Sequence, residues 1–288
     1  MSESEQDPFP PQGVDLDRPS VARVYDWYLG GTANWAIDRE FGKKVLSVFP
    51  TARPGAIANR LFLHRAVRYL ARLGVRQFVD IGSGIPTMGN THQVADEVAP
   101  DSKVVYIDNE AVAVAHSQVL LEQHGDPARH AAINGDLRDT DRLWQRVVET
   151  GLIDLGEPIA LLIIAVLHFN QPGPDGLDMG PQAVSRYREL LPSGSYLTIS
   201  NATYEGLPEQ NEAQAVNAQR MYKTSSSSST IFRSHQEIRA LFGDFDLVEP
   251  GMCWAPLWHP EESSQTAPMI TFVSPNESGM WVGVGRKP

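Results

Sequence analysis

The clearest chemical signal in the sequence is a carboxylate followed closely by two glycines, in the segment Phe78-Val79-Asp80-Ile81-Gly82-Ser83-Gly84. The apolar residues before Asp80 predict a buried strand, and glycine lets the turn after it approach a ligand closely. A second apolar run, 104–107, ends at another acid, Asp108. Because the carboxyl ends of parallel strands meet at one edge of a sheet, both acids should face one nucleotide-type pocket. There they could accept hydrogen bonds from hydroxyl and ammonium groups.

The spacing of the glycines restricts which adenosine-containing cofactor this pocket could hold. A dinucleotide fingerprint needs a third glycine where Thr87 stands, and a P-loop needs a lysine that does not follow. The Asp80 carboxylate would repel a negatively charged pyrophosphate, but it would attract the free ammonium group of an amino acid. We therefore expect S-adenosylmethionine rather than NAD, with Asp108 accepting from the ribose hydroxyls.

A third acid, Asp136, follows a third apolar segment, 131–134, and lies between Gly135 and Leu137. Simpler explanations exist for two of the acids, because Asp136 could cap a helix starting near Asp139 and Asp108 a helix starting at Glu110. Acids at three successive strand ends favour the joint interpretation as a cofactor pocket.

An alternation of strands and helices must position these residues. Three helices, near 20–29, 37–48 and 56–73, are expected before the first strand. Predicted strands then cover 77–81, 103–107, 131–134, 159–166, 195–200, 246–249 and 281–285, with helices near 91–99, 110–124, 139–150 and 181–191. This pattern predicts an α/β fold, a doubly wound, mostly parallel, seven-stranded Rossmann-like sheet with additional N-terminal helices. We expect a loose tail at 1–18, a helical lid or cap at 19–75, and the cofactor-binding domain at 76–288.

Composition narrows the class of partner and the compartment. The formal net charge of −11 argues against a nucleic-acid backbone, which needs a basic surface. A single cysteine, Cys253, excludes an intrachain disulfide and a cysteine-cluster zinc site. The acidic, polar start is no signal peptide, and the longest apolar run, 159–167, is too short to span a bilayer. We expect a cytoplasmic protein with no nucleic-acid and no membrane partner.

Several strings resemble a bacterial family of S-adenosylmethionine-dependent methyltransferases that was long known only as a domain of unknown function. They run from Arg18 to Glu40 and continue at Asn59-Arg60, Asp80-Ile-Gly-Ser-Gly-Ile-Pro-Thr87, Val105-Tyr-Ile-Asp-Asn109, Gly135-Asp-Leu-Arg-Asp139, Ala165-Val-Leu-His168, Arg233-Ser234 and Val284-Gly-Arg-Lys287. The resemblance covers nearly the whole chain from Arg18 and implies the seven-strand fold and the cofactor, but no acceptor. The chain departs from the general seven-strand pattern at Pro86, where many such enzymes have a third glycine.

The resemblance also suggests roles for individual residues. An acid at Asp136 would accept from the adenine amino group, and the N-terminal helices would lie over the cofactor, with Tyr28 and Gly30 close to it. Helix-pair packing around a glycine turn is the alternative for these helices. The expected cofactor-binding residues are Asp80, Gly82, Ser83, Gly84, Asp108, Asn109, Asp136, Leu137, Ala165, Tyr28 and Gly30.

His168, just after the strand expected at 159–166, is the candidate catalytic residue. If the acceptor is a hydroxyl, this imidazole could act as a general base, because it is mostly neutral at pH 7. The alternative is that it only bonds backbone and closes the pocket. No Asn-Pro-Pro-Tyr string follows this strand, which argues against methylation of a nucleobase or amide nitrogen. Weaker candidates are His92, His64, Trp254, Trp258 and His259, and no metal-spaced cluster appears.

Three classes of function remain open on the sequence alone. The first is a methyltransferase acting on a small molecule. The second is a noncatalytic protein that binds S-adenosylmethionine or S-adenosylhomocysteine, which a closed pocket without an acceptor cavity would favour. The third is a nicotinamide oxidoreductase, against which the missing third glycine counts. The sequence names neither the acceptor atom nor the oligomeric state.

Overall fold

The computed structural model describes residues 15–288, so most of the tail expected at 1–18 lies outside the described residues. Three helices precede the first strand: α1 (Val21–Tyr28), α2 (Ala36–Val48) and α3 (Ala52–Arg72). Ser20 caps α1 as predicted, because its side chain accepts a hydrogen bond from the Arg23 amide at 3.3 Å. Gly30 follows the end of α1 with a φ of 82°, a left-handed conformation that suits glycine.

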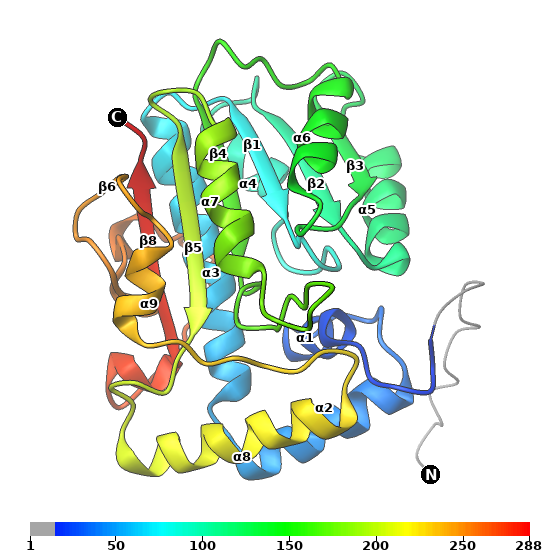
Figure 1. The fold of residues 1–288 in the computed structure, drawn as a ribbon, viewed down its shortest axis with the longest axis vertical. Helices are drawn as coiled ribbons and strands as arrows, with labels where there is room; N and C mark the ends of the chain where they lie inside the picture. Colours follow the sequence, from blue (N-terminus) through cyan, green and yellow to red (C-terminus); the bar gives the residue numbers. More distant parts are fainter. Residues whose placement is uncertain (1–14) are drawn as a thin grey trace.

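A single sheet lies at the centre of the molecule (Figure 1). Its strands are β1 (Gln77–Ile81), β2 (Lys103–Asp108), β3 (His130–Asn134), β4 (Ile159–Ile164), β5 (Tyr196–Ala202), β6 (Asp246–Leu247), β7 (Cys253–Trp254) and β8 (Met280–Arg286). Their order in the described chain is β3-β2-β1-β4-β5-β8-β6, and β7 also pairs with β8. The first five strands are parallel and β8 is antiparallel to β5. This confirms the mostly parallel, Rossmann-like fold.

Side chains alternate between the two faces of the sheet along each strand, and those on both faces are apolar. Helices therefore cover both faces. Val79, Ile81, Leu161 and Ile163 belong to one apolar cluster, which also contains residues of α6 (Thr140–Glu149), α7 (Gly180–Leu190) and α9 (His235–Ala240). The opposite cluster holds Phe78, Val104, Ala160 and Leu162 together with residues of α3 and α4 (Thr91–Asp96). Between β2 and β3 in the chain lies α5 (Ala111–His124), which contacts both strands. The arrangement is the doubly wound one that the sequence predicts.

A third apolar cluster joins the N-terminal helices to a late helix, α8 (Glu209–Ser225). It contains Val24, Tyr28, Phe41 and Val45, together with Ala218 of α8. Figure 1 shows α2 and α8 running side by side beneath the sheet, in agreement with their contacts. In contrast, α3 packs on the sheet itself, where it contacts β4 and β8.

Three details differ from the sequence-based expectation. Helix α8 was not predicted, because its buried positions are mostly small or polar (Asn211, Ala215 and Ala218) and give no clear apolar stripe. Strand β4 ends at Ile164 instead of residue 166, because Ala165 adopts a left-handed conformation with a φ of 58°. The two-residue strand β7 was also not predicted. Three short 3-10 turns follow it in the chain, Ala255–Leu257, Pro260–Glu262 and Pro275–Ser278.

Candidate functional site

A cavity of about 140 Å³ lies at the carboxyl ends of β1, β2 and β4, where the sequence places its acids. Eight of the expected cofactor residues line it: Asp80, Gly82, Ser83, Gly84, Asp108, Asn109, Leu137 and Ala165. The turn is held to β2, because the amides of Gly82 and Ser83 both donate to the Ile107 carbonyl, at 2.8 and 3.0 Å. A Cβ on Gly82 would meet Val166 at 2.3 Å, so only glycine fits there.

Asp80 is buried in the floor of this first cavity. Its Oδ2 accepts a hydrogen bond from the Thr91 hydroxyl at 2.7 Å, while Oδ1 accepts from no residue in the described part of the chain. Burial raises the pKa of this carboxyl above its usual range, and the Thr91 bond and the Arg60 charge oppose that shift. Asp80 therefore has one oxygen free for a ligand.

Asp108 shares its oxygens with the backbone around it. Oδ2 accepts from the Gly84 amide and Oδ1 from the Glu110 amide, both at 2.8 Å. The bond to the Glu110 amide is the helix-capping contact that the sequence offered as a simpler explanation for Asp108. Asp108 makes this contact and also lines the cavity. Burial raises the pKa of Asp108, and the two amide bonds act against that rise.

Three expected cofactor residues do not line this cavity. Asp136 instead pairs with Arg138 at 2.5 Å, and these hydrogen bonds lower the pKa of its carboxyl; its neighbours Gly135 and Leu137 form the wall. Gly30 lines neither this cavity nor the second one described below. Tyr28 lies on the second cavity. Cofactor contacts by these three residues remain predictions.

Sequence reasoning missed two charged residues on the first cavity, Arg60 and Glu110. Arg60 comes from α3, is largely buried, and donates its Nε hydrogen to the Met88 carbonyl at 2.9 Å. Glu110 follows Asp108 by two residues and accepts from the Ser20 hydroxyl at 2.5 Å. The only sequence signal for Arg60 was its place in an Asn-Arg pair within a helix, where an arginine is usually exposed.

A second cavity, of about 130 Å³, adjoins the first. Val21, Tyr25, Ala165 and Phe169 line both, so the two cavities share a wall at the end of β4. The other lining residues come from α1, the end of α2, α3, α8, the end of β5, the segment between α8 and α9, and the start of β8. Among them are Phe49, Ala56, Asn59, Ala215, Ala218, Tyr222, Phe232 and Met280. Within the described chain this lining contains no Asp, Glu, Lys or Arg side chain.

His168 faces the second cavity, and its ring is tied to β5. The Ala202 amide donates to Nδ1 at 3.3 Å, so the neutral ring carries its hydrogen on Nε2. Burial, together with the Arg233 charge, lowers the pKa of His168 to about 3. The ring is thus neutral at pH 7 with a donor on its free side, which favours a hydrogen-bond donor over a general base.

The weaker candidates of the sequence line neither cavity. His64 contacts the carbonyls of Met88 and Gly89 at 3.1 and 2.9 Å, and His92 bonds the Tyr106 hydroxyl at 2.7 Å. Trp258 is buried in the core, and His259 lies 2.5 Å from Glu261. Trp254 stacks edge-on against Trp281. These side chains therefore have structural roles.

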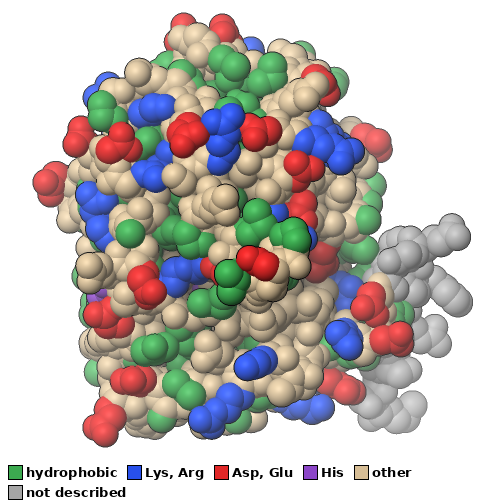
Figure 2. All heavy atoms as spheres, viewed as in Figure 1, with side chains coloured by type: hydrophobic (Ala, Val, Ile, Leu, Met, Phe, Trp, Pro, Cys, Tyr) green, Lys and Arg blue, Asp and Glu red, His purple; other side chains and the backbone are tan. Residues whose placement is uncertain are grey.

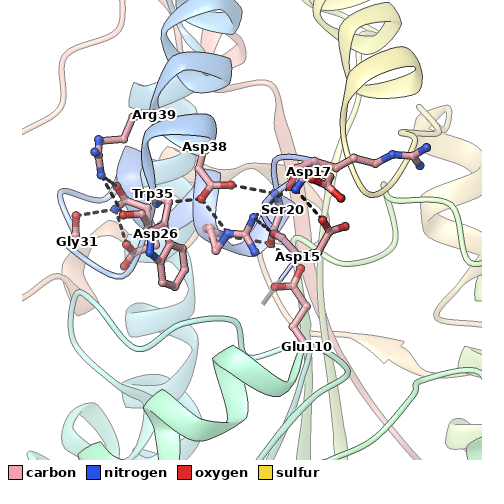
Figure 3. Close-up of polar contacts among 12 residues, drawn as sticks. Asp15, Asp17, Ser20, Asp26, Gly31, Trp35, Asp38, Arg39 and Glu110 are labelled. Atoms are coloured by element: carbon pink, nitrogen blue, oxygen red, sulfur yellow. Dashed lines mark hydrogen bonds and ion pairs between the residues drawn. The ribbon is translucent and has the colours of Figure 1, made fainter. Parts of the chain in front are cut away.

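A polar network attaches α1 and α2 to the first cavity (Figure 3). The fully buried Asp38 accepts from the Ser20 amide at 2.9 Å, the Arg23 guanidinium at 2.8 Å and the Trp35 amide at 3.0 Å. Figure 3 shows Glu110 approaching Ser20 from the start of α5, so this network reaches the cavity wall.

A second contact ties α1 directly to the glycine turn. Asp26, which is buried, accepts from the Thr87 hydroxyl and from the Asn34 amide group, the latter at 2.8 Å. A Cβ on Gly31 would lie 1.9 Å from the Asp26 carboxylate, so glycine is required beside it. The Asp26–Thr87 contact explains why a threonine stands where a dinucleotide fingerprint has its third glycine.

Comparisons with known proteins identify the class that this fold and site define. A family model described as S-adenosyl methyltransferase matches residues 8–288, and the chain belongs to this family. A crystal structure of a putative methyltransferase from Thermobifida fusca is 35% identical with a TM-score of 0.82, covering 97% of this chain and 98% of that one. A DUF574 family protein from Streptomyces avermitilis is 33% identical with a TM-score of 0.83, covering 95% and 99%. No curated protein matches.

The chain is therefore an S-adenosylmethionine-dependent methyltransferase, as the sequence predicted. This sets aside the noncatalytic binding protein and the nicotinamide oxidoreductase. Within residues 15–288, no helix combines the length and the apolar character that crossing a bilayer requires. The same residues contain no group of three His, Cys, Asp or Glu side chains that could hold a metal ion.

Proposed function

We propose that this methyltransferase holds its cofactor in the first cavity and methylates a small molecule held in the second. The shared wall at Ala165, Phe169, Tyr25 and Val21 supports the proposal, because ligands held in two adjoining cavities could approach each other there. When bound, S-adenosylmethionine supplies a methyl group on a positively charged sulfur, so the protein needs chiefly to bring the acceptor close and aligned.

The residues of the first cavity fit the cofactor's polar groups. The free Oδ1 of Asp80 suits the ammonium group, and the Arg60 guanidinium suits the carboxylate. Asp108, beside the open turn at Gly84, suits the ribose hydroxyls. Leu137 and the Gly135 backbone provide an apolar edge for the adenine. Asp136 is paired with Arg138 and does not line this cavity, so its part in binding adenine rests on the resemblance alone.

The second cavity suits a small molecule better than a polymer. Eight short segments of the described chain contribute lining residues, so an acceptor would contact protein on several sides. Acidic and basic side chains are interspersed over the face seen in Figure 2, and the net charge is −11. A nucleic-acid acceptor would call for a continuous basic surface instead.

A crystal structure with S-adenosylhomocysteine tests this assignment. The amino-acid end should contact Asp80 and Arg60, the ribose should contact Asp108, and the sulfur should lie near Ala165, facing the second cavity. A cofactor product lying across the second cavity, or with its sulfur turned away from Ala165, would contradict the proposal.

A further inference from the structure

The part of the second cavity that residues 15–288 form has no acidic or basic side chain to pair with a charged acceptor. We propose that its occupant is a neutral, ring-bearing amine and that the amine nitrogen receives the methyl group. This inference rests on the proposed function and adds the chemical class of the acceptor. Its basis is the described lining of the cavity, the absence of a base among those residues, and three of their polar atoms that have no partner in residues 15–288.

Aromatic and small apolar side chains make up most of the lining. Six rings, Tyr25, Tyr28, Phe49, Phe169, Tyr222 and Phe232, surround the space. Rings of this kind pack against flat apolar molecules in offset or edge-to-face arrangements. A charged acceptor would lose its hydration there without gaining a counter-charge, because none of the described lining residues is an acid, a lysine or an arginine.

Among the described lining residues, no side chain is placed to remove a proton from a hydroxyl. The Nδ1 of His168 already accepts the Ala202 amide, so its other nitrogen is a donor. Tyr28 and Tyr222 are phenols whose pKa values burial raises, that of Tyr222 to about 12. The carboxylates of Asp80 and Asp108 lie on the first cavity only. A hydroxyl acceptor would therefore lack its base, whereas a neutral amine has a free lone pair.

Asn59 supplies an unpaired acceptor for the hydrogen of such an amine. The Tyr25 hydroxyl donates to the Ala56 carbonyl at 3.0 Å, so its oxygen must accept, and the Asn59 Nδ2 donates to it at 2.9 Å. This fixes the orientation of the Asn59 amide and leaves Oδ1 buried with no partner in residues 15–288. Asn59 is only 1% exposed and lines the cavity, so an N–H group of a ligand would satisfy it.

Thr230 provides a second unpaired group on the same lining. Its Oγ1 is buried without a partner among the described residues, and its backbone pairs with Phe169. Buried polar atoms of side chains generally have hydrogen-bond partners in native proteins. The Tyr28 hydroxyl is also buried without a partner among the described residues, so three such atoms belong to residues that line this cavity. A ligand with a few polar groups would complete them.

The chemical step balances without a base on the enzyme. The lone pair of the amine forms the new nitrogen–carbon bond, and the electron pair of the broken carbon–sulfur bond stays on the sulfur. The positive charge passes from the sulfur to the nitrogen, and the resulting ammonium loses its proton to water. An apolar cavity also disfavours protonation of the amine before the reaction, because burial penalises the charged form.

Three compounds with one bicyclic skeleton test the acceptor class: 5-aminoindane, 5-indanol and indane-5-carboxylate. Calorimetry on the full chain saturated with S-adenosylhomocysteine should show binding of the amine, with the carboxylate at least about a hundredfold weaker. Ala218→Phe, which fills the second cavity, should abolish amine binding while S-adenosylhomocysteine still binds; Ala215→Leu is a milder second variant. Amine binding that neither variant changes would overturn the acceptor cavity itself, and with it the proposed function.

Other results overturn only the acceptor class. Equal binding of the carboxylate, or binding of none of the three compounds, would do so while leaving the cofactor site intact. With radiolabelled S-adenosylmethionine, we expect N-methylation of the amine and none of the indanol. Transfer to the indanol alone would overturn the choice of nitrogen.

Two threonine variants form a matched comparison for the polar contacts. Thr230→Val removes a buried, unpaired hydroxyl from the cavity, and Thr198→Val removes one from β5, away from both cavities. Asn59→Leu removes the unpaired acceptor. We expect Asn59→Leu to weaken amine binding about fivefold, Thr230→Val to weaken it less, and Thr198→Val to leave it unchanged. Equal effects of the two threonine variants, with Asn59→Leu neutral, would contradict the placement of the amine.

Discussion

Asp80 and Asp108 are both buried carboxylates at strand ends, yet their hydrogen bonds leave them free for different tasks. Asp80 bonds one hydroxyl and keeps Oδ1 open. Asp108 holds two amides of the chain, those of Gly84 and Glu110, and so fixes the turn as well as facing the cavity. The two residues should therefore respond differently when the ligand is shortened.

A truncated ligand separates the two roles. 5′-Methylthioadenosine has the adenosine and sulfur of S-adenosylhomocysteine but lacks the amino-acid end. We expect Asp80→Asn and Arg60→Met to lower the affinity for S-adenosylhomocysteine by roughly tenfold to a hundredfold, because each removes a charged hydrogen-bond partner. Neither should change the affinity for methylthioadenosine, measured by calorimetry. Arg72→Met, which alters an exposed arginine of the same helix, is the control. Equal losses for both ligands would contradict the assignment.

Replacing Asp108, predicted to bind the ribose, should lower cofactor affinity more than replacing Asp136, predicted to bind adenine. Asp108→Asn should weaken S-adenosylhomocysteine and methylthioadenosine alike, by on the order of tenfold or more, because the charged acceptor near the ribose is lost. Asp136→Asn should have the smaller effect, because Asp136 does not line the first cavity whereas Asp108 does. Calorimetry measures both, and circular dichroism melts verify that the variants fold. A larger loss for Asp136→Asn would contradict the predicted order of the two acids.

Residue type and position after a strand were enough to find Asp80 and Asp108. Those acids follow apolar runs, and the runs could only be strands of a buried parallel sheet. Arg60 and Asn59 could not be found in the same way, because they lie within a long helix whose apolar pattern says nothing about which polar residues face inward. Their roles depend on where α3 crosses the sheet, which is a tertiary fact.

At the scale of elements, α1 is held to the glycine turn by Asp26 and Thr87, and to the start of α5 by Ser20 and Glu110. Both contacts end on residues at or next to the first cavity. Helix α1 also supplies Val21 and Tyr25 to the wall between the cavities. We propose on these contacts that α1 covers the cofactor and responds to its binding.

Hydrogen exchange tests that proposal. The amides of residues 20–35 should gain protection when S-adenosylhomocysteine binds. Thr87→Val removes the donor to the buried Asp26, which costs about 1–3 kcal/mol, so α1 should exchange faster and gain less protection. Thr150→Val also removes a hydroxyl bonded to a protein oxygen, at the end of α6, and should leave this region unchanged. Equal exchange rates at residues 20–35 in the two variants would contradict a response of α1 to the cofactor.

Helix α8 shows why part of the site escaped sequence reasoning. Its residues Ala215, Ala218 and Tyr222 line the second cavity, but most of the helix is polar and exposed. The usable signal was local: charged residues Glu209 and Glu212 in the first turn after Pro208, with alanine-rich, strongly helix-forming residues beyond. Such a pattern predicts a helix without saying which face it buries.

At the scale of the whole molecule, the sheet separates two apolar layers, and the two cavities lie at the carboxyl edge where helices from both ends of the chain meet. Several histidines are enclosed by this packing. Burial, with nearby arginine charges, lowers the pKa of His64 to about 4, and burial likewise lowers that of His92 to about 4. These buried neutral rings make the stability of the fold depend on pH.

His64 offers the cleanest test, because it lines neither candidate ligand cavity and its ring contacts two carbonyls. Its pKa is about 4 in the folded chain and about 6.5 when unfolded, so between these values only the unfolded chain takes up the proton. The stabilising contribution of neutral His64 to the free energy of unfolding is therefore fully present above pH 6.5. It falls as the pH drops toward 4, by up to about 1.4 kcal/mol per pH unit.

His64→Gln keeps a donor for the carbonyls of Met88 and Gly89 but cannot titrate in this range. The free energy of unfolding in urea, measured at pH 7, 5.5 and 4.5, should fall more steeply for the wild type than for the variant. Since Asp80, Asp108 and Glu110 have raised pKa values and oppose the trend, the difference between the two proteins, rather than either slope, isolates the histidine. Parallel pH profiles would show that His64 takes up its proton in the folded chain as readily as in the unfolded one.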